Sequence, residues 1–203
     1  MTDTPLSPQS SSLSPRLVEW QGETVDATAL RLPDIVAPDL LVLFVGFNPS
    51  VYSALRGHYY ARPGNRFWFL LERAGLTPRR YAPHEDRSLL DLGIGITDLC
   101  PIPTPGVEDV PRAVAESGRG ALEAKIERWR PRIVCFNGRA TYERFFGRAP
   151  SGWGLQPETI GSRPSHVFVV PSSSGRANAV GVAREAAFVA LGELVRAEQS
   201  RPV

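Results

Sequence analysis

Residues 40–50, LLVLFVGFNPS, form an apolar run that ends in a cluster of small and polar residues. A second apolar run, HVFVV at residues 166–170, ends in a similar cluster, PSSSGR at residues 171–176. Short runs rich in β-branched residues and bounded by Gly or Pro are typical of buried strands in a parallel sheet. Ligands of open α/β sheets bind just beyond the carboxyl ends of such strands, so we expect both clusters to face one crevice.

Strands and helices alternate along the remaining chain. Further strands are predicted over residues 93–98 and 132–137, and helices over residues 65–75, 83–90, 111–130, 140–146 and 184–197. Asn65 is placed to cap the first of these helices and Gly75 to end it. Alternation of this kind favours right-handed crossovers. We therefore predict an α/β fold with three layers, α/β/α, around a short, mainly parallel central sheet of four to five strands.

The length and composition favour one domain. A chain of 203 residues with 42% hydrophobic residues can form one well-packed core, which we place at residues 18–199. Residues 1–17 have the Ser/Pro-rich composition of a disordered arm, and residues 200–203 form a short polar tail. The sequence contains neither a membrane-spanning apolar stretch nor the apolar core of a signal peptide. We expect a cytoplasmic monomer without membrane contact, associated with the nucleoid if the source is bacterial.

Metal-ligating residues are scarce. Cys100 and Cys135 are the only cysteines, they are far apart in sequence, and the chain has only 3 histidines. This spacing argues against a disulfide framework, a zinc site or an iron–sulfur cluster, so we predict no metal and no cofactor.

The basic residues are almost all arginines. Lys125 is the only lysine among 23 basic residues. Arginine suits bidentate contact with phosphate, although a GC-rich genome produces the same bias. Arg56, Arg62 and Arg66 cluster just after the first polar cluster. The intervening loop, residues 56–65, also contains tyrosines, and this mixture suits stacking of a base beside a bound phosphate. Tyrosines in loops also serve as packing lids.

Each polar cluster offers a candidate functional group. Asn48 follows the first strand, and Pro49 biases it toward an extended backbone, where its amide can hold a ligand or a water molecule. It can equally cap the next turn. Residues 172–174 offer hydroxyl groups and backbone N–H groups for a phosphate, or form a plain serine-rich turn. A serine nucleophile is excluded, because there is no Gly-x-Ser-x-Gly elbow and no histidine after His166.

Several short motifs follow one another along the chain: GFNP (46–49), GHYY (57–60), PGNRFW (63–68), GIGIT (93–97), PRIV and FNG (131–138), GLQP (154–157) and PSSS (171–174). Together they resemble the motifs of the mismatch-specific uracil/thymine DNA glycosylase family. They follow that family's order and span roughly residues 40–197. The resemblance implies the three-layer fold of the uracil-DNA glycosylases.

The resemblance also implies an activity in DNA repair. Such an enzyme flips uracil out of a duplex in which the uracil faces guanine. A wider substrate range would include thymine or a damaged pyrimidine. The enzyme then hydrolyses the N-glycosidic bond and leaves an abasic site, with no lyase step. The partner would be double-stranded DNA with a mispaired uracil or thymine. The alternative is a non-catalytic nucleic-acid-binding module that uses the same aromatic and arginine-rich loop.

Residue roles follow from the resemblance as expectations. Asn48 would orient the attacking water, and Tyr60 would stack on the flipped base, whose edge backbone N–H groups near Phe47 and Tyr60 would contact. Gly46 would serve close packing. Ser53 would either help to position the water or cap a helix. The residues expected to contact DNA are Arg62, Ser172, Ser173, Ser174, Gly175 and Arg176, with Arg176 filling the space that the flipped base leaves.

Asp98 departs from the family's pattern, since relatives carry Lys or Asn after the GIGIT motif. A carboxylate pointing into the crevice would act as a general base toward the water or would stabilise the cationic sugar. The alternative is an aspartate that caps the following loop.

Overall fold

The computed structural model describes residues 14–175 and 181–200. It contains a five-stranded sheet with the strand order β4-β3-β5-β7-β6. The parallel strands are β3 (Val42–Gly46), β4 (Ile94–Asp98), β5 (Ile133–Asn137) and β7 (Ser165–Val170). The edge strand β6 (Gly154–Ile160) pairs antiparallel with β7. The predicted three-layer α/β fold with a mainly parallel sheet is confirmed.

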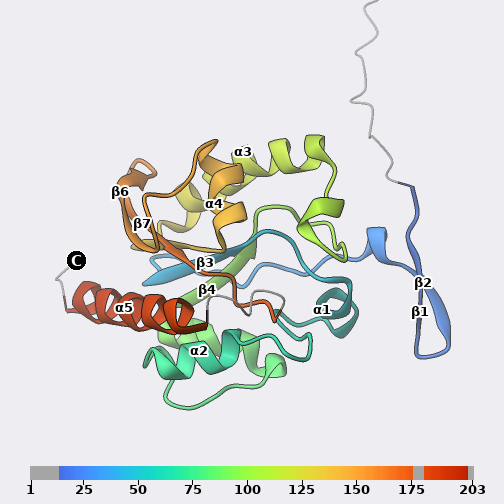
Figure 1. The fold of residues 1–203 in the computed structure, drawn as a ribbon, viewed down its shortest axis with the longest axis horizontal. Helices are drawn as coiled ribbons and strands as arrows, with labels where there is room; N and C mark the ends of the chain where they lie inside the picture. The colour runs from blue at the N-terminus through green and yellow to red at the C-terminus, as the bar shows by residue number, and fades with distance from the viewer. Residues whose placement is uncertain (1–13, 176–180, 201–203) are drawn as a thin grey trace, which may run out of the picture.

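Helices cover both faces of this sheet (Figure 1). One layer consists of α2 (Phe67–Arg73), the 3-10 helix η2 (Pro83–Leu92) and α5 (Gly181–Gln199). The other consists of α3 (Arg112–Trp129) and α4 (Arg139–Phe146). The short helices α1 (Val51–Arg56), η1 (Ala27–Ala29) and η3 (Val107–Asp109) lie in the connections.

Strand β3 shows why the sheet needs both layers. All five of its residues are buried, and they alternate between the two sides because successive side chains point to opposite faces. Val42 and Phe44 pack in the core under α2 and α5, whereas Leu43 and Val45 pack in the core under α3 and α4. A continuous apolar run is therefore what this central strand requires.

Helix α2 begins and ends close to the predicted positions. The Asn65 side chain accepts a hydrogen bond from the Phe67 backbone N–H at 3.0 Å, which satisfies one of the free donors at the helix start. After the helix, Gly75 adopts a left-handed backbone with φ of 67°.

Three strands, the edge strand β6 and the two strands of a hairpin, were not predicted from the sequence. Strand β6 lies at the edge of the sheet, contains Pro157, and has an irregular register between Leu155 and Thr159, so its sequence lacks a clean alternation. The hairpin of β1 (Leu17–Trp20) and β2 (Glu23–Asp26) has only four residues per strand. Because Leu17 belongs to β1, the disordered arm predicted to reach Leu17 is wrong at its last residue; residues 1–13 lie outside the described part.

The hairpin stands beside α1, away from the sheet (Figure 1). Its Trp20 ring meets the Tyr52 ring edge-on, with centroids 5.7 Å apart. The Arg56 guanidinium lies 5.2 Å from the Trp20 ring centroid and adds a cation–π contact. In the described ranges, 14–175 and 181–200, no helix has the length and apolar character needed to cross a membrane.

Candidate active site

The carboxyl ends of the four parallel strands meet at one edge of the sheet, and a cavity of about 390 Å³ opens there. Its lining includes residues 46–50, residues 172–174, and side chains from the loops after β4 and β5. The two polar clusters, more than a hundred residues apart in the chain, thus face one crevice, as the sequence predicted.

Asn48 is held in one orientation at this cavity. Its Nδ2 donates hydrogen bonds to the Ile102 carbonyl oxygen at 3.0 Å and to the Thr104 Oγ1 at 2.7 Å. The Thr104 hydroxyl donates its own proton to the Gly106 carbonyl oxygen at 2.5 Å, so it can only accept from Asn48. The amide oxygen of Asn48 consequently remains as the acceptor for a ligand or a water molecule.

Asn48 does not cap the following helix, because Ser50 does. The Ser50 Oγ accepts a hydrogen bond from the Ser53 backbone N–H at 3.1 Å at the start of α1. Ser53 is 4% exposed, and its Oγ accepts a hydrogen bond from the Ala61 backbone N–H at 3.1 Å. Ser53 therefore ties α1 to the loop that carries Tyr60, and both serines line the cavity.

The loop that carries Tyr60 is anchored by a buried carboxylate. Asp86 of η2 is 4% exposed, and its Oδ2 accepts the Tyr59 backbone N–H at 3.1 Å and lies 3.3 Å from the His58 Nδ1. Tyr60 itself has a left-handed backbone with φ of 53°. This conformation is strained for a tyrosine, and the anchored loop holds it in place.

Tyr60 lies against the core and lines the cavity. Its ring stacks on Phe67, with ring centroids 3.9 Å apart and an interplanar angle of 27°. Burial, reinforced by the nearby Asp98 carboxylate, raises the pKa of the Tyr60 hydroxyl, so this group stays protonated. A neutral aromatic ring backed by a second ring forms a rigid platform against which a flat ligand can stack.

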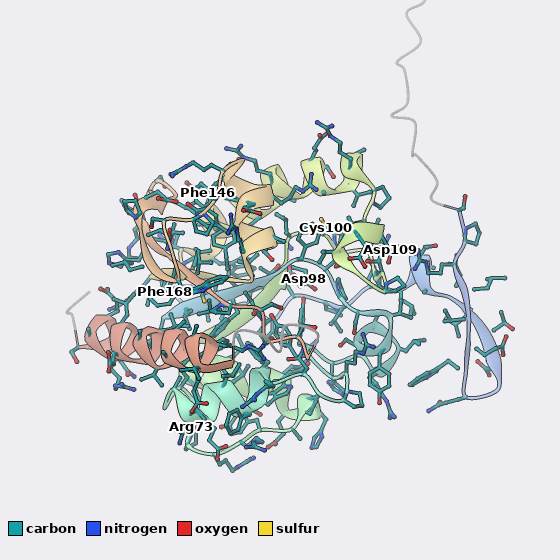
Figure 2. All side chains as sticks on the ribbon, viewed as in Figure 1. Arg73, Asp98, Cys100, Asp109, Phe146 and Phe168 are labelled. Atoms are coloured by element: carbon teal, nitrogen blue, oxygen red, sulfur yellow. The ribbon has the colours of Figure 1, made fainter. Side chains whose placement is uncertain are left out.

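Asp98 ends β4 and points into the protein toward the cavity. It is 7% exposed, it lies between the helical layers marked by Phe146 and Arg73 in Figure 2, and its Oδ2 has no hydrogen-bond partner among the described residues. Asp98 therefore does not cap the following loop. Burial and, to a smaller extent, the Asp34 carboxylate raise the pKa of Asp98 to about 8, while Lys125 acts in the opposite direction.

Gly46 lies directly beside Asp98, its register partner on the neighbouring strand. A Cβ atom at residue 46 would stand 2.2 Å from the Asp98 Oδ1 and 3.5 Å from the Tyr60 hydroxyl oxygen. Because Gly46 has no side chain, the Asp98 carboxylate can occupy the space beside it. This close approach agrees with the packing role expected for Gly46.

The sequence and the fold each match known proteins. The sequence model of the Uracil DNA glycosylase superfamily matches residues 33–193. The chain belongs to this superfamily. The fold is also similar to the solution NMR structure of a candidate uracil DNA glycosylase from Methanosarcina acetivorans, at 21% sequence identity and a TM-score of 0.52, over 82% of this chain and 98% of that one.

Membership in the superfamily gives the chain its general activity class. Uracil DNA glycosylases are hydrolases of DNA repair that act on base–sugar bonds in DNA. The cavity at the carboxyl edge of the sheet is accordingly the candidate active site of a DNA glycosylase.

Asn137, at the end of β5, holds the serine cluster of the glycosylase (residues 172–174) in place through two hydrogen bonds to Ser173. The Asn137 Nδ2 donates to the Ser173 Oγ at 2.9 Å, and the Ser173 backbone N–H donates to the Asn137 Oδ1 at 2.9 Å. Ser173 is 1% exposed and its carbonyl oxygen accepts the Arg66 backbone N–H at 2.9 Å. All three serines line the cavity of the glycosylase, with Ser173 buried and Ser172 and Ser174 half-buried.

Of the other residues predicted to contact DNA, the structure describes two, Arg62 and Gly175. Arg62 is exposed and lines the mouth of the cavity. Gly175 lies close to the Gly64 carbonyl oxygen, 2.8 Å from where a Cβ at residue 175 would stand, so the two loops meet without a side chain between them. Arg176, the predicted gap-filling residue, lies outside the described residues.

Three residues of the site were not singled out from the sequence as functional. They are Asp86, Thr104 and Asn137. Asn137 ends a predicted strand at the same edge as Asn48, so the strand-end rule could have found it. Asp86 and Thr104 lie in irregular connections, and no local pattern marks them. Within the described part of the glycosylase, no group of three or more His, Cys, Asp or Glu side chains could hold a metal ion, and the absence of a metal stays a prediction.

Proposed function

We propose that this glycosylase excises uracil, and to a lesser extent thymine or a damaged pyrimidine, from duplex DNA in which that base faces guanine. One observation carries the proposal: the oriented amide of Asn48 and the Tyr60 ring line the same cavity. The ordered motifs of the mismatch-specific family, GFNP and PSSS among them, support it further. Mispaired bases cost least to extrude, which favours them as substrates.

The flipped base enters the cavity beside Tyr60. Phe67 supports one side of the Tyr60 ring, and backbone N–H groups near Phe47 and Tyr60 contact the edge of the base. Stacking on an aromatic ring contributes about 1–3 kcal/mol per base and tolerates different bases. The edge contacts therefore supply the selectivity for a pyrimidine.

Cleavage proceeds through a sugar with oxocarbenium character and a departing base anion. The Asn48 amide oxygen accepts a hydrogen bond from the attacking water and aims it at the anomeric carbon. This oxygen is the acceptor because Nδ2 already donates to Ile102 and Thr104. Water attack breaks the carbon–nitrogen bond, and the electrons of that bond leave with the base.

Asp98 assists this step in its ionised form. A carboxylate beside the cavity accepts a proton from the water and stabilises positive charge on the sugar. Its pKa of about 8 makes it a stronger base than a solvated aspartate. The cost is that only part of the enzyme carries the ionised group at neutral pH.

The enzyme is monofunctional. A lyase step needs an amine that forms a Schiff base with the sugar. The only lysine, Lys125, is bound to Asp34 at 2.8 Å and lies on α3, outside the cavity lining. The product is therefore an abasic site.

The DNA backbone is bound by residues at the mouth of the cavity. Ser172 and Ser174 contact the phosphates beside the flipped nucleotide, and Ser173 positions them through Asn137. Arg62 adds a phosphate contact, and Arg176 enters the duplex where the base was.

The proposal is tested on duplexes that each contain one modified pair. The protein is incubated with U·G, U·A, T·G and single-stranded uracil substrates at fixed salt, and abasic sites are cleaved with alkali. We expect cleavage of U·G first and no strand break before the alkali step. Binding of DNA without any base release would instead support the non-catalytic binding module.

A further inference from the structure

Lys125 forms a closed set of polar contacts with Asp34 and with Thr97, the residue that precedes Asp98 in β4. Its Nζ lies 2.8 Å from the Asp34 Oδ2 and 2.9 Å from the Thr97 Oγ1. The Thr97 hydroxyl in turn donates to the Asp34 Oδ1 at 2.6 Å. Each member contacts the other two, so the three side chains fix one another.

This set lies across the strand from Asp98. Thr97 and Asp98 are consecutive in β4, so their side chains point to opposite faces of the sheet. Asp34 reaches Thr97 because its neighbour Ile35 pairs with Ile96 through two backbone hydrogen bonds, of 2.9 and 2.8 Å. Lys125 reaches both from α3, which covers that face.

The groups whose charges act on Asp98 are few. Tyr59 and Tyr60 face it from the loop after α1, Cys100 follows it in the chain, and burial keeps all three protonated. Burial raises the pKa of the Asp98 carboxyl most, the Asp34 carboxylate raises it further, and the Lys125 ammonium lowers it, so the two charges act with opposite signs. Both are only about a quarter exposed, with side-chain exposures of 28% and 27%, so water screens them incompletely.

We propose that Lys125 and Asp34 act as a positioning pair that sets the ionisation of Asp98. Lys125 compensates the Asp34 carboxylate, and Thr97 holds the pair next to the strand end. The catalytic consequence of this pair rests on the function proposed above for Asp98.

A lysine suits this position better than the arginine used elsewhere in the chain. Its compact ammonium places one charge between two oxygen atoms of different residues. The planar guanidinium of arginine is larger, spreads its charge, and prefers two oxygens of one carboxylate.

The two members of the pair give opposite expectations. In Asp34→Asn, the Lys125 charge is uncompensated and favours the Asp98 carboxylate, so the pKa of Asp98 falls. In Lys125→Gln, the Asp34 charge is uncompensated and disfavours it, so this pKa rises. We expect changes of about threefold or more in the ionisation constant. Damage to packing alone would move both variants in the same direction or neither.

The experiment follows the Asp98 carboxyl by ¹³C NMR during a pH titration of the free protein, with Asp98→Asn identifying the signal. Glu123→Gln, which breaks an exposed ion pair with Arg119 on the same helix, is the matched control and should not move the midpoint. Melting temperatures verify that each variant is folded. Unchanged midpoints, or midpoints that shift in the same direction in both variants, would overturn the proposal.

Single-turnover base release from a U·G duplex is measured on the same variants. Opposite movement of the pH–rate profiles would support both the pair and the catalytic role of Asp98. Opposite NMR midpoints with an unmoved rate profile would support the pair and contradict the role of Asp98 in the reaction. The NMR result stands even if no base is released, so the two proposals fail separately.

Discussion

At the scale of single residues, the candidate site depends on side chains that have little freedom. Asn48 donates from one end of its amide to Ile102 and Thr104, and this leaves the other end toward the cavity. A group held this way is organised before the substrate arrives, which is the main source of electrostatic catalysis.

Replacing Asn48 by alanine removes that acceptor. We expect single-turnover excision from a U·G duplex to fall by about 10²–10³-fold, because in the proposed mechanism the attacking water loses its orienting partner. Binding to DNA that contains an abasic site should change little, as measured by fluorescence anisotropy. Gln199→Ala, which removes an exposed amide at the end of α5, serves as the control. A parental rate in Asn48→Ala would contradict the assignment.

Asp98 should make excision depend on pH. In the role proposed for Asp98, the ionised carboxylate is the active form. Because its pKa is raised to about 8, the rate should increase as the pH rises through 8 and level off above it. In Asp98→Asn this rise should disappear and the plateau rate should fall by about 10²-fold or more. A pH–rate profile at saturating enzyme measures both. A parental profile in the variant would remove Asp98 from the reaction.

The same substitution should stabilise the protein. The pKa of Asp98 is higher in the folded protein than in a solvated aspartate, so folding binds the proton more tightly. The favourable contribution of this group is complete below about pH 4 and is lost as the pH rises through 8. Urea denaturation should therefore show Asp98→Asn more stable than the parent at pH 9, with a smaller difference at pH 5. Equal stabilities at pH 9 would mean that the carboxyl is not desolvated.

At the scale of elements, η2 controls the geometry of the neighbouring loop. The Asp86 carboxylate accepts the Tyr59 backbone N–H and contacts His58, and these bonds hold the backbone that places Tyr60. Asp86→Ala leaves a buried donor without its acceptor, at a cost of about 1–3 kcal/mol.

We therefore expect Asp86→Ala to weaken substrate binding more than it slows the chemical step, because Asn48 and Asp98 stay in place. Titration of the single-turnover rate with enzyme concentration separates the two effects. Asp91→Ala, at an exposed position of the same helix, should behave as the parent does. Equal substrate binding by the two variants would show that the contacts of Asp86 with Tyr59 and His58 do not contribute to function.

The elements also show what sequence patterns can and cannot predict. Strands β3, β4, β5 and β7 were predicted because each is a short buried run that depends on local composition. Strand β6 was not, because an edge strand with a proline and an irregular register acquires its structure from β7. The polar supports of the site were missed for a related reason. Asn48 and Thr104 are 56 residues apart, and Asn137 and Ser173 are 36 apart, so only the folded chain brings them together.

At the scale of the whole molecule, binding to DNA should follow the charges around the cavity mouth. Each phosphate contact releases counterions, so affinity falls as salt increases. Arg62→Ala should weaken binding to matched and mismatched duplexes alike. The slope of log affinity against log salt should become shallower by about one, the value expected for one lost phosphate contact. Arg139→Ala, an exposed arginine in an ion pair with Glu143, tests whether any positive charge near the cavity has the same effect. Equal losses in both variants would contradict a specific role for Arg62.

The contact between Gly46 and Asp98 also limits how such a protein can evolve. Because a Cβ at residue 46 would stand 2.2 Å from the Asp98 Oδ1, a mutation that enlarges residue 46 requires the Asp98 side chain to move or to be replaced. The two positions should therefore change together in evolution. A descendant that exchanges this carboxylate for another chemistry also gains room for a side chain at the end of β3.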